Sequence, residues 1–184
     1  GFNILKKIII VNFATNFEVY INSLIDEILK TRVGMEIIKK EIGEKILKIY
    51  YNEIYKFKSI KDLYEYIGQD YIKKNFEDKP MEKKLMVLSK TLLNNSIKLE
   101  KKLIKEFYQT RHIIVHNLGI VDKEYINKSG SKKFNIGEER EINDEYIDNI
   151  YKKLIEIINK IHKSVKKKVE YYNKLNTLDN PIEI

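Results

Sequence analysis

The sequence predicts an all-α fold. Only two prolines and seven glycines interrupt 184 residues, and apolar residues recur at steps of three and four along most of the chain. Hydrophobic residues make up 43% and charged residues 34%, a composition typical of a globular protein and not of a disordered or membrane-embedded one. We expect a helical bundle of long up-and-down helices with short accessory helices, forming one domain over residues 1–184.

The N-terminal part is expected to form two long helices. The first covers roughly residues 4–31, and Gly34 is its expected stop. Its apolar face contains Phe13, Phe17, Ile21, Leu24 and Ile28. The second presents Ile38, Ile42, Ile46 and Ile49 and is expected to fray near residues 55–58.

Two shorter helices are expected next. Ser59 and Asp62 have the spacing of a capping box, with Asp in place of the usual Glu or Gln, which predicts a helix over about residues 60–74. Pro80 suits a first helical position, where the missing N–H has no intrahelical partner, so another helix should begin there. Residues 94–96 are the next expected break.

Two long helices are expected in the C-terminal half. One runs from about residue 97 to Gly119, which suits a left-handed C-terminal cap. Its apolar face contains Leu99, Leu103, Phe107, Ile114 and Leu118. Residues 120–143 are expected to be irregular, with a short hairpin around Gly137. The last helix covers about residues 144–176, with an apolar seam of Ile147, Tyr151, Leu154, Ile158, Ile161 and Val165.

Composition also limits the function. The formal net charge of +8 favours a phosphate-bearing partner, most simply a nucleic acid, although a Lys and Ile bias throughout the chain is consistent with solvated helix faces alone. The absence of cysteine excludes disulfides and thiolate metal sites. The longest apolar run, Ile8–Val11, is far shorter than the roughly 18 residues of a spanning helix. We therefore expect a cytoplasmic protein with no membrane association.

The segment RHIIVH, residues 111–116, holds one of the three arginines and two of the three histidines. At about 100° per residue, Arg111 lies at the edge of the apolar stripe, and His112 and His116 share a face up to about 140° away. One straight helix does not aim Arg111 and His116 at the same atom. Either the arginine side chain bends around the helix end, or a second copy of the chain completes the site.

These residue types suit RNA cleavage without a metal. The reaction needs a base for the 2′-hydroxyl proton, an acid for the departing 5′-oxygen and a cation for the phosphorane. Histidine acts as acid or base near neutral pH, and arginine grips phosphate oxygens. A zinc site on His112 and His116 is the less favoured interpretation, because no Asp or Glu lies at a matching step. Glu106 is expected to be solvated or to pair with an arginine, and His162 to be an exposed structural residue.

The motif RHIIVHN resembles the R-polar-x-x-x-H motif of the HEPN superfamily, a group of all-α domains found in toxin–antitoxin, phage-defence and CRISPR-associated ribonucleases. Arg111 and His116 match the motif arginine and histidine, His112 matches the polar position, and Asn117 matches a residue that often follows. The segments FATNFEVYINSLIDEIL and IVHNLGIVDKEY are similar to the first helix and to the linker that follows the motif helix in the same group. Residues 50–95 have no such match.

The resemblance implies a homodimeric, metal-independent endoribonuclease without a cofactor. Arg111 and His116 of both copies would be catalytic, with His112 and Asn117 in support. An antitoxin or another defence-system protein is then an expected partner. The alternative is a non-catalytic HEPN module that binds RNA or nucleotides or only dimerises. The basic run KSVKKK, with Lys163, Lys166, Lys167 and Lys168, is a solvated face or an RNA-binding surface outside the active site.

Overall fold

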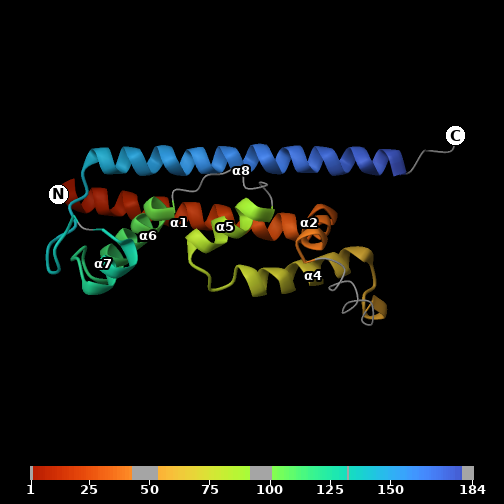
Figure 1. The fold of residues 1–184 in the computed structure, drawn as a ribbon, viewed down its shortest axis with the longest axis horizontal. Coiled ribbons are helices and arrows are strands. Elements are labelled where there is room, and N and C mark those ends of the chain that lie inside the picture. The colour runs from red at the N-terminus through yellow and green to blue at the C-terminus, as the bar shows by residue number, and fades with distance from the viewer. Residues whose placement is uncertain (1, 43–53, 92–100, 132, 180–184) are drawn as a thin grey trace. The chain divides into compact units, whose positions relative to one another are not determined.

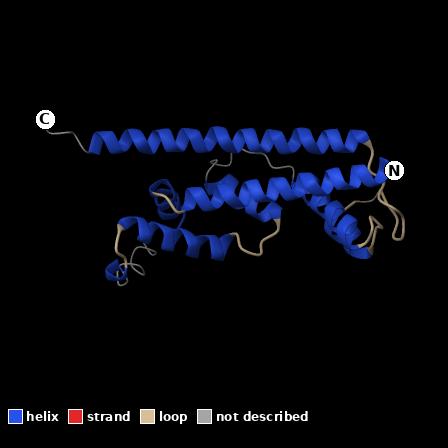
Figure 2. Ribbon diagram, turned by 180° about the vertical axis from the view of Figure 1, so that it is seen from behind, coloured by secondary structure: helices blue, strands red, loops and turns tan. Residues whose placement is uncertain are grey.

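The computed structural model describes residues 2–42, 54–91, 101–131 and 133–179 (Figure 1). Over these residues the fold is all-α, as predicted, with seven α-helices, one 3-10 helix and a single isolated β-bridge (Figure 2). In chain order the elements are α1 (Phe2–Leu29), α2 (Arg32–Ile42), η1 (Ile54–Lys56), α4 (Ile60–Asn75), α5 (Met81–Thr91), α6 (Lys101–His116), α7 (Lys123–Ser129) and α8 (Asp144–Asp179). The expected positions of Ile46, Ile49, Leu99 and the break at residues 94–96 lie outside the described residues.

Contacts divide the chain into two compact units, which are described in turn. The first comprises Gly1–Ile21, Pro80–Glu82 and Lys98–Ile158, and the second comprises Asn22–Lys79, Lys83–Ile97 and Asn159–Ile184. The single domain expected from the chain length stays a prediction.

The core of the first unit is built from α1, α6, α7 and the start of α8. Phe17 and Ile21, on the apolar face predicted for the first helix, are buried, and Phe13 stacks on Tyr151 with ring centroids 5.7 Å apart. Helices α6 and α7 pack against each other (Figure 1). The other buried apolar side chains of this unit include Ile10, Ala14, Ile104, Phe107, Ile113, Val121, Tyr125, Ile150 and Leu154.

Helix α7 corrects the prediction that residues 120–143 are irregular. Asp122, which had no predicted role, caps the helix by accepting a hydrogen bond from the Tyr125 backbone N–H at 2.6 Å. Gly130 ends it in the left-handed conformation, at φ 67°. The Tyr125 side chain is completely buried, so its contacts in the unit compensate for the weak helical propensity of seven mostly polar residues.

The expected hairpin around Gly137 also differs from the structure. Gly137 turns the chain at φ 87°, and the Glu138 N–H donates to the Asn135 carbonyl at 3.2 Å, but the bonds beyond this turn join the segment to the chain that follows α6. The Val121 N–H donates to the Glu138 carbonyl and the Gly137 N–H to the Val121 carbonyl, each at 2.8 Å. An antiparallel bridge joins Ile120 and Glu139. This segment therefore fixes the exit from α6.

A buried ion pair holds the first unit together. The Glu106 carboxylate accepts hydrogen bonds from Arg140 Nη2 at 3.1 Å, Tyr125 OH at 2.8 Å and Tyr146 OH at 2.8 Å, as well as from Thr110 Oγ1 at 2.9 Å. Arg140 is only 7% exposed, and its guanidinium lies 4.4 Å from the ring centroids of both Phe134 and Tyr146. Glu106 is thus the partner of an arginine, but of Arg140 from a distant segment.

The second unit is organised by two glycines that approach the end of α1. A Cβ on Gly34 would lie 2.4 Å from the Ile28 carbonyl oxygen, and a Cβ on Gly68 would lie 2.4 Å from the Leu29 carbonyl oxygen. Gly34 lies inside α2 and is not the stop of the first helix, which ends at Leu29. Instead, Thr31 Oγ1 accepts the Gly34 N–H at 3.3 Å, and the missing side chain lets α2 begin directly against α1.

Helices α4 and α5 begin close to the positions predicted from the sequence. Ser59 and Asp62 form the predicted capping box, and α4 begins at Ile60. Pro80 directly precedes α5. Helix α2 packs against α4.

Helix α1 also bears on the membrane prediction. Its residues Asn3–Leu29 have the length and apolar composition needed to cross a membrane, criteria that a core helix of a water-soluble protein satisfies too. The uninterrupted apolar run Ile8–Val11, on which the sequence prediction is based, is short, whereas the average composition of the whole helix is apolar. Location in the cytoplasm stays a prediction.

We expect Arg140→Met to lower the free energy of unfolding by roughly 3 kcal/mol, because it leaves the Glu106 carboxylate without its cation in a buried setting. Urea unfolding followed by circular dichroism measures this. The control is Lys74→Met, which removes the exposed Lys74–Asp70 pair, 2.7 Å apart, and should cost less than about 1 kcal/mol. Equal losses would show that burial adds nothing to the Glu106–Arg140 pair.

Alkaline pH should destabilise the protein through Tyr125 and Tyr146. Burial, and then the Glu106 charge, raise the pKa of both hydroxyls above the value of 10.0 found without these effects. Because the two tyrosine hydroxyls have a higher pKa in the folded than in the unfolded protein, their contribution to the free energy of unfolding is complete below about pH 10 and is lost as the pH rises further. Tyr146→Phe should be less stable at about pH 8 yet lose less stability between about pH 8 and pH 10.5. Urea unfolding at both pH values tests this, and parallel declines would contradict it.

Candidate active site

The motif lies at the C-terminal end of α6, as predicted. The Ile113 carbonyl accepts hydrogen bonds from the N–H groups of Asn117 and Gly119, each at 2.8 Å. Leu118 and Gly119 both have left-handed backbones, with φ of 53° and 87°, which confirms the cap predicted at Gly119. Arg111 and His116 therefore occupy the last two turns of a helix that ends sharply.

Two side chains secure this helix end. Lys7 of α1 donates to the Leu118 carbonyl at 2.8 Å and to the Glu139 carboxylate at 2.7 Å. Asn117 donates from its side-chain amide to the Ile120 carbonyl at 2.8 Å. Asn117 thus holds the turn after the motif, and its supporting role in the site stays a prediction.

The two motif histidines contact each other. The ring centroids of His112 and His116 are 4.7 Å apart with an interplanar angle of 47°, so the prediction that they share a face is confirmed. His112 is half-buried and His116 is exposed. His112 also acts on Glu124 of α7. The pKa of Glu124 is lowered mainly by the hydrogen bond from Lys128 and to a lesser extent by the His112 charge.

Arg111 is half-buried and its guanidinium forms no hydrogen bond or ion pair with any described residue. Its electrostatic neighbour is Tyr108, one turn earlier. Burial raises the pKa of Tyr108, the charge of Glu18 raises it further, and Arg111 lowers it. The Tyr108 hydroxyl donates to the Ala14 carbonyl at 3.3 Å. Arg111 is therefore a cation near Tyr108 whose donors have no described acceptor.

The site includes residues that the sequence reasoning did not select. Tyr108 precedes Arg111 by three positions, so helical spacing alone could have placed it beside the arginine. Glu18 and Glu124 come from other helices, and no local pattern marks them. The tyrosine network around Glu106, five residues before Arg111, lies on the same helix but is completed by Arg140 and Tyr146, far along the chain.

The lysines proposed for RNA binding belong to the part of α8 in the second unit. Lys163, Lys166 and Lys167 are exposed. Lys168 is half-buried and donates to the Thr91 carbonyl at 2.6 Å, and burial, followed by the charge of Lys40, lowers its pKa. Lys168 thus has a structural contact, whereas Lys163, Lys166 and Lys167 have no hydrogen bond or ion pair within the described part of the chain.

Within the described part of the chain, no group of three His, Asp or Glu side chains is arranged to hold a metal ion. His112 and His116 share a face, but the described carboxylates do not complete a metal-ligand set with them. The described side chains of the motif at this helix end are two imidazoles and a guanidinium.

Comparisons with protein-family models, with curated proteins and with solved structures found no match to this chain. The resemblance to the HEPN superfamily therefore stays a prediction, based on the motif residues and their place on a helix.

We expect Gly119→Ala to destabilise the protein for two reasons. The left-handed backbone alone should cost about 1–2 kcal/mol. The added Cβ, which would lie 2.8 Å from Lys7 Nζ, should add to that cost. Lys7 would then leave the Leu118 carbonyl and Glu139. Gly130→Ala is the matched control, since Gly130 is also left-handed but has no atom within 4 Å of an added Cβ. Urea unfolding of both variants measures the difference, and equal losses would contradict a role for the Lys7 contact.

Proposed function

We propose that this protein is a metal-independent endoribonuclease of the HEPN type. The observation that carries the proposal is the end of α6, where His112 and His116 are in ring contact and Arg111 has no described hydrogen-bond partner. A contacting imidazole pair, of which His116 is exposed, and an available guanidinium within six residues supply the three groups that RNA cleavage by transesterification needs.

In the proposed reaction, a neutral His116 imidazole takes the proton of the 2′-hydroxyl, and the resulting oxyanion attacks the adjacent phosphorus. Arg111 stabilises the charge of the pentacoordinate phosphorane, and a protonated imidazole gives a proton to the departing 5′-oxygen. The products are a 2′,3′-cyclic phosphate and a 5′-hydroxyl. DNA has no 2′-hydroxyl, so the substrate is RNA.

The complete site is proposed to need two copies of the chain. On one helix, His112 and His116 share a face, whereas the charge of Arg111 acts on Tyr108. A two-fold homodimer would bring the two α6 ends together, so that one copy's His116 acts as base and the other's as acid, with Arg111 of both copies around one phosphate. His112 and Asn117 then support the catalytic histidine and the turn that follows it.

The proposed setting is the cytoplasm, as the effector of a toxin–antitoxin or phage-defence system with a cognate antitoxin or defence protein as partner. The net charge of +8 supports a nucleic-acid substrate. Exposed Lys163, Lys166 and Lys167 favour a second candidate function, a non-catalytic module that binds RNA through α8 alone.

Purified protein incubated with mixed RNA in EDTA should cleave it and leave 2′,3′-cyclic phosphate ends. Arg111→Ala and His116→Ala should each reduce the rate by roughly a hundredfold or more, because each removes a group that acts in the transition state. His162→Ala removes another exposed histidine, on α8, and should cleave at the wild-type rate. Circular dichroism and sedimentation confirm that the variants keep fold and assembly.

The outcomes separate the two functions. Cleavage that survives in both motif variants, or that requires Mg²⁺, would contradict the catalytic proposal. Intact RNA that is nevertheless bound, with binding weakened by replacing Lys163, Lys166 and Lys167 with Glu, would identify the non-catalytic module. A strictly monomeric yet active protein would contradict the composite site.

A further inference from the structure

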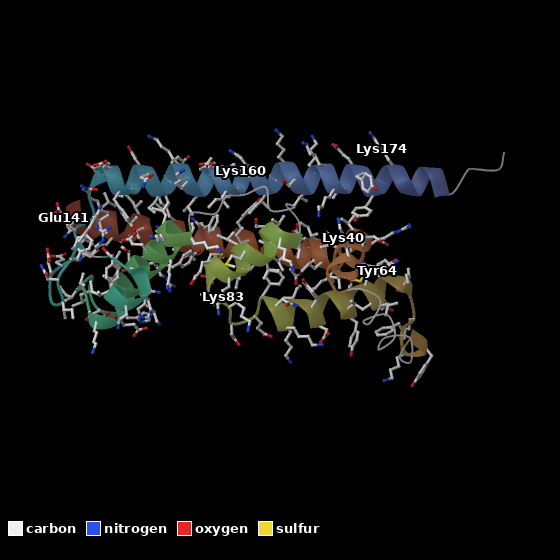
Figure 3. All side chains as sticks on the ribbon, viewed as in Figure 1. Lys40, Tyr64, Lys83, Glu141, Lys160 and Lys174 are labelled. Atoms are coloured by element: carbon white, nitrogen blue, oxygen red, sulfur yellow. The ribbon has the colours of Figure 1, made fainter. Side chains whose placement is uncertain are left out.

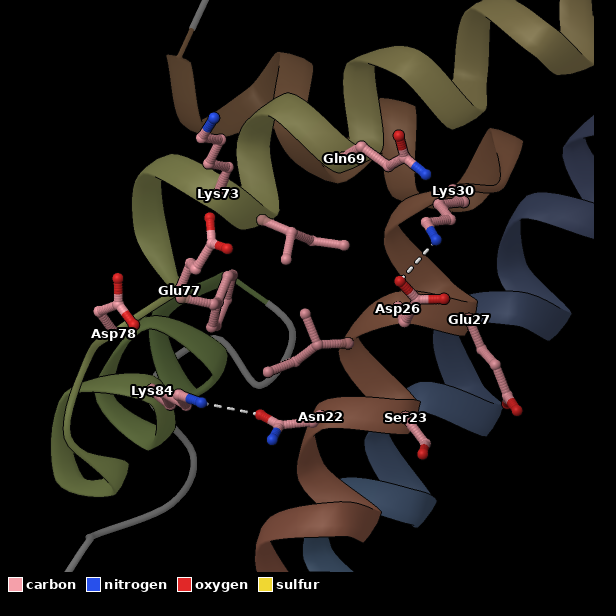
Figure 4. Close-up of a pocket in the computed structure, with 13 residues that line it drawn as sticks. Asn22, Ser23, Asp26, Glu27, Lys30, Gln69, Lys73, Glu77, Asp78 and Lys84 are labelled. Atoms are coloured by element: carbon pink, nitrogen blue, oxygen red, sulfur yellow. Dashed lines mark hydrogen bonds and ion pairs between the residues drawn. The ribbon is translucent and has the colours of Figure 1, made fainter.

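A cleft of about 680 Å³ lies in the second unit (Figure 4), and its lining contains no residue of the motif. It is formed by the C-terminal part of α1, the last turns of α4, the loop that follows and the start of α5. Its size falls within the roughly 300–1,000 Å³ of small-molecule sites. The residues on which its chemistry depends are Lys84, Asn22, Ile25, Ile72, Phe76 and Glu77.

Lys84 is a buried cation without a counter-charge among the described residues. Its side chain is on α5, only 8% of the residue is exposed, and its ammonium donates to the Asn22 side-chain oxygen at 2.9 Å (Figure 4). That partner is a neutral amide, and no described carboxylate forms an ion pair with Lys84. An ammonium has three donors, so two have no described acceptor. A buried charge of this kind is costly unless an anion meets it.

The same cleft has an apolar wall. Ile25 and Phe76 are nearly completely buried, and Ile72 is half-buried. The Asn22 amide nitrogen has no described acceptor and adds a second donor next to Lys84. One charged donor and one neutral donor beside three apolar side chains form a site for an anionic head group joined to an apolar body.

The other charges of the cleft restrict the ligand. Asp26 is paired with Lys30 at 2.6 Å, but the exposed carboxylates of Glu27, Glu77 and Asp78 have no described ion-pair partner. Lys73 also lines the cleft, so its four carboxylates outnumber its three ammonium groups, and a polyanion such as RNA or a nucleotide triphosphate meets net repulsion there. A single negative charge can reach Lys84 with much less repulsion.

We propose that this cleft binds a small monocarboxylate with an apolar body. The carboxylate accepts hydrogen bonds from Lys84 and from the Asn22 amide, and the apolar part rests on Ile25, Ile72 and Phe76. The proposal does not depend on RNA cleavage, since every residue involved belongs to the second unit and none is part of the motif.

The test uses the full chain and three carboxylate probes of increasing length: benzoate, phenylacetate and 4-phenylbutyrate. Binding is measured by titration calorimetry and by the shift of the unfolding temperature. At least one carboxylate should bind, while benzamide, inorganic phosphate and AMP should not. Lys84→Met should weaken the bound carboxylate by about tenfold or more, because it removes the charged donor but keeps the stem. Lys83→Met is the matched control, because Lys83 is the exposed neighbour on α5 (Figure 3), and it should bind as the wild type does.

A second variant keeps the test decisive if Lys84→Met fails to fold. Asn22→Asp places a carboxylate within 2.9 Å of the Lys84 amine, so it should raise the unfolding temperature and abolish probe binding together. The proposal is overturned if no carboxylate binds at about 10 mM, if benzamide binds as well as the tightest-binding carboxylate, or if binding persists unchanged in either folded variant. RNA cleavage by the same variants should be unaffected. A result that overturns the carboxylate site would therefore not contradict the proposed ribonuclease activity.

Discussion

The structure of the first unit depends on one carboxylate. Glu106 accepts hydrogen bonds from α6 itself, from Tyr125 of α7, from Arg140 before α8 and from Tyr146 in the first turn of α8. These four donors come from segments up to 40 residues away, so the carboxylate fixes the relative positions of three helices. Arg140 is only 7% exposed, so losing its only described carboxylate would cost much of the free energy of unfolding.

The candidate active site follows from this constraint. The helix that carries Glu106 also carries Arg111, His112 and His116, so fixing α6 against α7 and α8 also fixes the base of the motif. The far end of the helix is secured by Lys7 and by the paired segment around Gly137. The histidines therefore project from a rigid helix end, and a catalytic group benefits from such support because small displacements are costly in rate.

Two buried cations among the described residues, Arg140 and Lys84, contrast with each other. Arg140 has a carboxylate, a tyrosine hydroxyl, the Glu141 carbonyl and two aromatic rings around its guanidinium, so its charge is fully compensated inside the protein. Lys84 has one neutral amide and an open cleft. The first arrangement is what a structural ion pair requires, and the second leaves its compensation to something outside the described chain. This difference distinguishes a stabilising network from a proposed ligand site.

The sequence by itself determined the all-α class, the apolar face of α1, the capping box at Ser59, the cap at Gly119 and the shared face of His112 and His116. Each of these depends on residues within about one or two helical turns of each other, the range over which periodicity and capping act. Only the tertiary structure decided that Glu106 pairs with Arg140, that Gly34 allows α2 to approach α1, that residues 123–129 form a helix around a buried Tyr125, and that Lys84 lines a cleft. Those outcomes depend on contacts between segments distant in sequence, and burial, which gives them their energy, is a property of the folded chain and not of a local pattern.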